Sequence, residues 1–214
     1  MNPPGHDMMD LASALRALLP RPIATAVVPA TGPLSLFPEE QRAVALAVSS
    51  RRADFAAGRS AARKAMAQLG MPAVAIPVGP RREPVWPLGV VGSISHASGW
   101  ALAALARADT PGAPRGLGID VEVHAPLAPE LEPLVLTARD RLEHATTMLA
   151  FSAKESVYKA LFPTLGWLLE FSDVTIEVVG PEAFRAVARS RDEERTLEGR
   201  FTVQGPLLLT AVTW

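Results

Sequence analysis

Three segments carry apolar side chains at helical spacing, and a proline or glycine stands close to the end of each. They are residues 10–19, 49–69 and 148–161. Pro163 is expected to end the third, because a proline inside a helix removes a backbone donor and crowds the preceding turn. Pro38, which stands before two glutamates, indicates the start of a further short helix. The pattern predicts helices over these ranges.

Short β-branched or apolar runs indicate strands between the helices. They are residues 22–29, 99–106, 116–123 and 174–179, and a closing hairpin of residues 201–203 and 207–212. Residues 71–89, with five prolines, predict an extended loop, and residues 92–96 predict a small polar turn. Because helices and strands alternate without a regular βαβ rhythm, we expect an α+β class rather than a doubly wound parallel sheet.

The linker-like stretch DTPGAPRG at residues 109–116 marks the expected boundary between two halves, residues 1–112 and 113–214. With 214 residues, 49% of them apolar and 20% charged, the chain fits one large or two small globular domains. No apolar run reaches the roughly 18 residues of a membrane span, and the first residues lack the order of a signal peptide. We therefore expect a cytoplasmic protein with no membrane contact.

The net charge of −1 argues against nucleic-acid binding. The distribution of charge along the chain is more informative than this net value. Residues 38–82 hold eight basic and three acidic side chains, whereas residues 120–155 hold seven acidic and three basic ones. The first segment could bind an anion and the second a cation. Because the chain contains no cysteine, a metal would need carboxylate or histidine ligands, and the four histidines, which include His6 and His144, have no metal-ligand spacing.

The sequence GIDVE at residues 118–122 places two carboxylates on one face of a predicted strand. Alternation directs Asp120 and Glu122 to the same side, while Ile119 and Val121 face the core. Such a pair suits a hard cation such as Mg²⁺, which takes one or two carboxylates together with phosphate oxygens and water. A solvated strand end is the competing interpretation.

The sequence FSAKESVYKA at residues 151–160 brings two of the chain's three lysines within six residues. Glu155 and Lys159 stand at i and i+4 of a predicted helix, which by itself indicates a surface ion pair. Most of the other basic residues of the chain are arginines. The clustering of Lys154 and Lys159 therefore indicates that the protein needs a compact point charge, such as one that binds a phosphate oxygen or a leaving group.

Two further segments have both a functional and a purely structural interpretation. Arg52, Arg59 and Arg63, flanked by Arg51, form one stripe on the predicted helix 49–69, and such a stripe usually faces water. The turn GSISH at residues 92–96 suits phosphate binding better than nucleophilic catalysis, because its serine and histidine are adjacent.

Five motifs, taken in this order, resemble an Sfp-type (EntD-like) 4′-phosphopantetheinyl transferase. They are GRSAAR, REPVWP, GSISHASGWALAALA, GIDVE and FSAKESVYKALFP, and they extend from about residue 51 to residue 163. The resemblance implies transfer of the phosphopantetheine arm of coenzyme A to a serine of an apo acyl or peptidyl carrier protein, which releases adenosine 3′,5′-bisphosphate. It also implies a pseudo-dimer of two similar α/β halves with the active site in the cleft between them. Because each chain would hold its own cleft, we expect a monomer.

The resemblance implies a role for particular residues. The metal ligands would be Asp120, Glu122 and Glu155, and they would hold Mg²⁺, with Mn²⁺ as a substitute. Glu155 would also be the base for the incoming serine, and Lys159 would contact the pyrophosphate. Coenzyme A would be bound by Arg51, Arg59, Arg82, Ser95 and His96. The N-terminal half would thus bind coenzyme A, while the C-terminal half would hold the metal and dock the carrier protein.

Two alternatives remain at this point. One is a non-catalytic module that binds a nucleotide or coenzyme A and regulates a partner, but such a protein would be expected to have lost a carboxylate or Lys159. The other is a Mg²⁺-dependent phosphohydrolase acting on small diphosphates, which leaves the GSISH segment and the clustered lysines unexplained.

Overall fold

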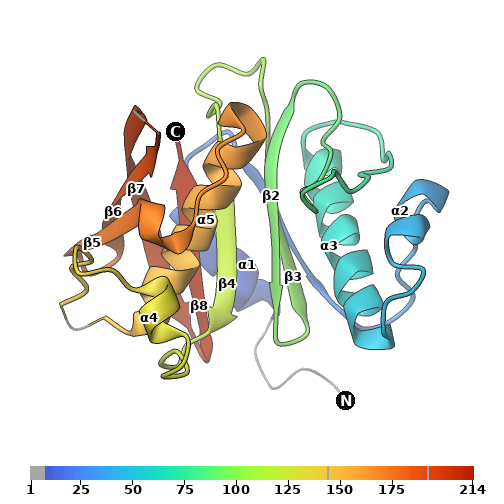
Figure 1. The fold of residues 1–214 in the computed structure, drawn as a ribbon. Helices are drawn as coiled ribbons and strands as arrows, with labels where there is room; N and C mark the ends of the chain where they lie inside the picture. The colour runs from blue at the N-terminus through green and yellow to red at the C-terminus, as the bar shows by residue number, and fades with distance from the viewer. Residues whose placement is uncertain (1–7, 144, 192) are drawn as a thin grey trace. The chain divides into compact units, whose positions relative to one another are not determined.

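The computed structural model describes residues 8–143, 145–191 and 193–214, so His6 and His144 lie outside the described residues. The chain divides into two compact units, Met1–Pro114 and Arg115–Trp214. In each unit a long helix packs on an antiparallel sheet, which confirms the expected α+β class (Figure 1). Over the described ranges, each helix is too short or too polar to traverse a lipid bilayer.

Unit 1 contains a sheet with the strand order β1-β3-β2, in which both pairings are antiparallel. Its elements are α1 (Met8–Leu18), β1 (Ala24–Pro29), α2 (Pro38–Ala43), α3 (Ser49–Gln68), β2 (Val90–Ala97) and β3 (Trp100–Arg107). Helix α3 packs on β1 and β3 through alanines that are fully or almost fully buried, among them Ala57, Ala61 and Ala65. Their small side chains let the helix approach the sheet closely.

Residues 92–96 are part of β2 and not a turn, so that prediction was wrong. Every residue from Val90 to Ala97 is paired with β3, and His96 lies opposite Ala101. Gly92 fits this strand because a Cβ there would press on the side chains of Leu105 and Trp86. The absence of a side chain at Gly92 therefore lets Leu105 and Trp86 pack close to the strand.

Unit 2 contains a larger antiparallel sheet with the order β4-β8-β7-β6-β5. Its elements are β4 (Leu117–Val123), α4 (Glu132–Val135), α5 (Thr147–Leu165), the 3₁₀ helix η1 (Phe171–Asp173), β5 (Val174–Gly180), β6 (Ala183–Ser190), β7 (Glu193–Gln204) and β8 (Leu207–Thr213). Helix α5 contacts β4 and β8, and its buried Ala153, Val157 and Leu161 join the core of this unit (Figure 1).

Helix α5 continues beyond Pro163, contrary to the prediction that this proline ends it. The helix ends instead at Gly166, which has a left-handed φ of 67° and whose N–H donates to Phe162 O at 2.9 Å. Pro163 removes a single backbone donor, which takes one hydrogen bond from the helix without ending it there. The closing hairpin is also longer than predicted, because β7 begins at Glu193 and β6 precedes it.

Gly118 of the GIDVE segment sets the distance between β4 and α5. A Cβ at this position would overlap Ser156 O and crowd Ala160 N, both of them backbone atoms of α5. Gly118→Ala is therefore expected to lower the free energy of unfolding by about 3 kcal/mol, the upper end of the usual cost of overpacking. Gly180→Ala is the control, since a Cβ there meets only Ala183 Cβ at 3.9 Å. Urea unfolding of both variants measures the difference, and equal midpoints would contradict the close approach.

Candidate active site

Asp120 is the centre of a polar cluster in unit 2. It lies on β4, is 3% exposed, and uses both carboxylate oxygens. Oδ1 accepts a hydrogen bond from Lys159 Nζ at 2.6 Å, and Oδ2 accepts one from Ser152 Oγ at 2.8 Å. Both donors come from α5. Lys159, for which the sequence indicated an ion pair with Glu155, thus forms an ion pair with Asp120.

Glu122 and Glu155 lie close enough to Asp120 for the charges to interact. Burial raises the pKa of Glu122 to about 7, with further upward contributions from Asp120 and Glu155 and a downward one from Lys159. Burial also raises the pKa of Glu155, against the attraction of Lys159 and together with the repulsion of Asp120. The structure therefore brings the four residues Asp120, Glu122, Glu155 and Lys159 into one electrostatic cluster.

A set of buried hydroxyl groups supports the cluster next to Asp120. The sequence analysis did not predict it. Ser152, Ser156 and Thr210 are fully buried. Thr210 Oγ1 lies 2.9 Å from Ser152 Oγ and 2.6 Å from Ser156 Oγ. The serines are four residues apart and so share one face of α5, which is the only signal in the sequence that could have pointed to them.

Lys154 does not have the role that its closeness to Lys159 suggested. Its side chain is 1% exposed and forms a buried ion pair with Asp140, with Nζ at 2.8 Å from Oδ2. Nζ also donates to Val135 O at 2.7 Å and to Phe171 O at 3.2 Å. At about 100° per residue, Lys154 points away from the stripe formed by Ser152, Glu155 and Lys159. Its charge is therefore used to join α5 to α4 and η1.

The donor atoms of the cluster suit a hard divalent cation. Asp120, Glu122 and Glu155 offer carboxylate oxygens, which Mg²⁺ prefers, and a cation would relieve the repulsion that contributes to the raised pKa values of the two glutamates. Within residues 8–143, 145–191 and 193–214, no three histidine, aspartate or glutamate side chains are already gathered as ligands of one ion. The donor atoms therefore fit such a cation. In this structure Asp120 is paired with Lys159 instead.

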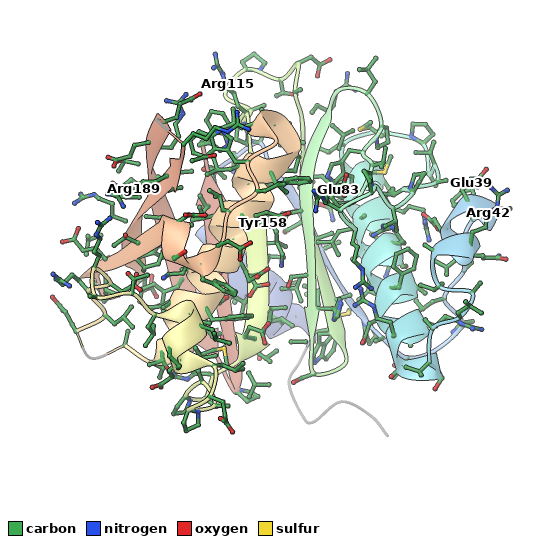
Figure 2. The ribbon with its side chains drawn as sticks, in the orientation of Figure 1. Glu39, Arg42, Glu83, Arg115, Tyr158 and Arg189 are labelled. Carbon is green, nitrogen blue, oxygen red and sulfur yellow. The ribbon has the colours of Figure 1, made fainter. Side chains whose placement is uncertain are left out.

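A small cavity of about 150 Å³ lies against this part of α5. Glu155 and Tyr158 line it from the helix, and Leu169, Glu170 and Phe171 are among the residues opposite. Tyr158 can be followed in Figure 2, where it projects from α5. Glu155 thus borders both the carboxylate cluster and a space that could admit part of a substrate.

In unit 1, the structure brings Arg51 and His96 together. Arg51 Nη1 lies 2.9 Å from His96 Nε2, and His96 Nδ1 lies 3.9 Å from Asp54 Oδ2. Arg51 is exposed at the start of α3, whereas His96 is half-buried on β2. Ser95, one residue earlier on that strand, is buried. Arg51 and His96 therefore form a partly accessible polar pair.

Arg59 and Arg63 do not form the solvent-exposed stripe that their spacing favoured. Arg59 is 5% exposed, donates from Nε to Ile76 O at 2.7 Å and lies 4.3 Å from the centre of the Phe55 ring. Arg63 pairs with Glu40, which is fully buried and also accepts from Ile76 N at 2.9 Å. These side chains hold the loop after α3. Coenzyme A binding by Arg59 stays a prediction.

Arg82 lies in a tight turn of that loop. Gly79 N donates to Glu83 O at 2.8 Å and Arg82 N to Gly79 O at 3.0 Å, so the turn is closed by its own backbone. Arg82 has a φ of 70°, in the left-handed region, and its side chain is exposed. Glu83, labelled in Figure 2, accepts from Arg81 N at 2.8 Å. The turn thus presents Arg82 to solvent.

Comparison with known proteins gives the family of this chain. Residues 39–106 match the 4′-phosphopantetheinyl transferase N-terminal domain, and residues 116–200 match the 4′-phosphopantetheinyl transferase superfamily. The chain is 36% identical to 4′-phosphopantetheinyl transferase PptT of Mycobacterium tuberculosis, over 94% of this chain and 96% of that protein. It is 41% identical to 4′-phosphopantetheinyl transferase Npt of Nocardia iowensis, over 68% of each. Enterobactin synthase component D of Salmonella typhi is 39% identical over 51% of this chain and 48% of that protein.

The chain therefore belongs to the 4′-phosphopantetheinyl transferase superfamily. It is an enzyme that transfers the 4′-phosphopantetheine group of coenzyme A to an apo carrier protein, as the sequence motifs indicated. The expected family fold is confirmed as well, because the two matched regions fall on two α+β units.

Proposed function

We propose that the transfer is carried out by the carboxylate cluster of unit 2, with Asp120, Glu122 and Glu155 as ligands of Mg²⁺ and Glu155 as the base. The observation that carries this proposal is the pairing of buried Asp120 with Lys159 beside two glutamates of raised pKa. Bound Mg²⁺, or Mn²⁺ in its place, would neutralise charge on the pyrophosphate oxygens of coenzyme A.

In the proposed reaction, the serine hydroxyl of the carrier attacks the phosphorus that bears pantetheine. A new P–O bond forms, and the bond from that phosphorus to the bridging oxygen breaks, which releases adenosine 3′,5′-bisphosphate. Glu155 takes the serine proton on its carboxylate. Lys159 stabilises the negative charge that develops on the phosphate oxygens.

We infer that the basic residues of unit 1 bind the phosphates of coenzyme A. Arg51, Arg82 and His96 are at least partly accessible, which supports a role in holding an anion. The hydroxyl of Ser95 is a further donor, and Arg59 would act from a more buried position. In this proposal residues 1–112 bind coenzyme A, and residues 113–214 hold the metal and receive the carrier.

We propose carriers of nonribosomal peptide, polyketide or fatty acid synthesis as partners, and the likeness to enterobactin synthase component D adds siderophore carriers to this set. We further propose that the protein is a monomer located in the cytoplasm. Sedimentation that finds a stable dimer with the active site at its interface would contradict the monomer.

Intact-protein mass spectrometry of an apo carrier incubated with the enzyme, coenzyme A and Mg²⁺ tests the proposal. We expect the mass of one phosphopantetheine group to be added to the carrier. The gain should disappear with Asp120→Ala and with a metal chelator, and should persist with Asp109→Ala, whose exposed carboxylate pairs with Arg107. A gain that survives chelation or Asp120→Ala would overturn the metal site. No gain on any class of carrier, with coenzyme A still bound, would favour the non-catalytic module.

A further inference from the structure

Glu40 is a buried carboxylate that joins three segments of unit 1. It lies in the first turn of α2 and is fully buried. Its Oε1 accepts a hydrogen bond from Ile76 N at 2.9 Å, and its Oε2 accepts one from Phe37 N at 2.9 Å. Arg63 of α3 donates from Nη1 to both oxygens, at 2.8 and 3.0 Å. Glu40 therefore ties the segment before α2, helix α3 and the loop after α3 to one point.

Arg59 of α3 holds the same part of the loop from the other side. Its Nε donates to Ile76 O at 2.7 Å, and its Nη2 donates to Pro77 O at 3.4 Å. The N–H of Ile76 is thus bonded to a buried carboxylate and its C=O to a buried guanidinium. Hydrogen bonds with a charged partner are stronger than those between neutral groups. We call these contacts of Glu40 and Arg59 with residues 76 and 77 the clamp.

The tight turn that carries Arg82 begins at the clamp. This turn, residues 77–85, is called the Arg82 turn below. Val85 N donates to Pro77 O at 2.9 Å, so one carbonyl accepts both from Arg59 and from the far end of the turn. The base of the Arg82 turn is therefore attached directly to the clamp. The direction in which the turn presents its exposed arginine depends on how the clamp holds that base.

We propose that Glu40 is a positioning residue for coenzyme A binding, which holds the Arg82 turn so that Arg82 meets a phosphate of the nucleotide. The proposal rests on the coenzyme A-binding function proposed above for Arg82. Glu40 is fully buried and acts through the loop, without a contact of its own to the ligand. When the clamp is broken, only a fraction of the molecules present Arg82 correctly, and the apparent affinity for coenzyme A falls by that fraction.

The sign of the charge change separates this proposal from simple electrostatics. Glu40→Gln removes a negative charge from a basic segment, so Coulomb attraction alone would strengthen the binding of coenzyme A, a polyanion. The clamp predicts weaker binding. An amide has one accepting oxygen, and its NH₂ group must then face a donor of Phe37, Arg63 or Ile76. The matched control is Glu39→Gln, which removes the same charge from the neighbouring exposed position of α2 (Figure 2).

Calorimetric titration of the folded proteins with coenzyme A gives the dissociation constants. We expect Glu40→Gln to bind coenzyme A about tenfold more weakly, as when the competent form falls to about a tenth of the population. Glu40→Ala, which removes every acceptor, should bind more weakly still. Glu39→Gln should stay within about twofold of the wild type, because exposed charges contribute little. The KM for coenzyme A should rise in Glu40→Gln while kcat stays unchanged, since only substrate binding is affected.

The Arg82→Ala background tests whether Glu40 acts through the Arg82 turn. With no guanidinium left to present, adding Glu40→Gln should cause no further loss of affinity for coenzyme A. Losses that simply add in the double variant would show that the two residues act independently, and the positioning role would be wrong.

The outcomes distinguish failure of this inference from failure of the proposed function. Wild-type or tighter coenzyme A binding by folded Glu40→Gln protein would overturn the positioning role alone, and a lower urea midpoint with that unchanged affinity would assign Glu40 a purely structural role. Equal weakening in Glu39→Gln and Glu40→Gln would also overturn it. Wild-type affinity in Arg82→Ala would remove Arg82 from the proposed coenzyme A site, and the positioning role with it.

Discussion

Lys154→Met is expected to lower the free energy of unfolding by about 3–5 kcal/mol, because it leaves the Asp140 carboxylate buried without its cation. The two side chains are only 1% and 3% exposed. Asp140 cannot easily turn to water, since its oxygens also accept from Thr137 N and Ile176 N at 2.7 Å each. Two backbone carbonyls, Val135 O and Phe171 O, lose their donor in the same change. Urea-induced unfolding measures the loss.

Lys159→Met is the matched control for this prediction. Lys159 lies on the same helix but is 26% exposed, and Asp120 keeps the hydrogen bond from Ser152 when Lys159 is replaced. We expect a smaller loss of stability than for Lys154→Met, because water can replace the partly exposed ammonium group beside Asp120, and a large loss of transfer activity. A stable but inactive Lys154→Met protein would instead show that Lys154 acts on a phosphate, as the clustering of lysines first suggested.

Glu155→Gln is expected to lower kcat by about 10²- to 10⁴-fold, the contribution usually made by a general base. The substitution keeps the shape of the side chain and removes the site that takes the serine proton. The rate of holo-carrier formation at saturating coenzyme A and Mg²⁺ gives kcat, and calorimetry gives the affinity for coenzyme A. The affinity should change little if Glu155 acts mainly on the proton.

Glu170→Gln is the control for Glu155, because Glu170 lines the same 150 Å³ cavity from the opposite side and carries the same charge. We expect it to stay within about twofold of the wild-type kcat, as is usual for an exposed group outside the reacting centre. Activity of Glu155→Gln at the wild-type level would show that Glu155 is not the base. Equal losses in both variants would assign the effect to the charge of the cavity as a whole.

Local patterns predicted most of the helices and the apolar strands. The strands at residues 117–123 and 174–180 are short apolar runs, and α3 has an uninterrupted alanine-rich helical repeat, so propensity and burial agree there. Strand β6 was missed because its sequence is rich in arginine. In the structure β6 nevertheless alternates between buried and exposed side chains, since Phe184, Ala186 and Ala188 are buried while Arg185 is exposed.

The site was predicted through motifs, whereas its supporting contacts depend on tertiary structure. GIDVE and AKES identified Asp120 and Glu155, which the structure brings into one cluster. Neither motif could indicate that Asp120 lies opposite Thr210, because that register joins positions 90 residues apart. The same limit explains why the sequence did not predict the burial of Arg59. Its partner Ile76 O lies in a proline-rich loop with no regular pattern.

The contact of α5 with β4 and β8 has a consequence for recombination between relatives. Ser152, Asp120 and Thr210 come from segments distant in the chain, yet their hydroxyl and carboxylate groups form one hydrogen-bonded set. A chimera that takes α5 from one parent and the C-terminal hairpin from another keeps this set only if both parents carry a hydroxyl at positions 152 and 210. A crossover that separates α5 from β8 is therefore expected to preserve the support of Asp120 only where both parents agree at these two positions.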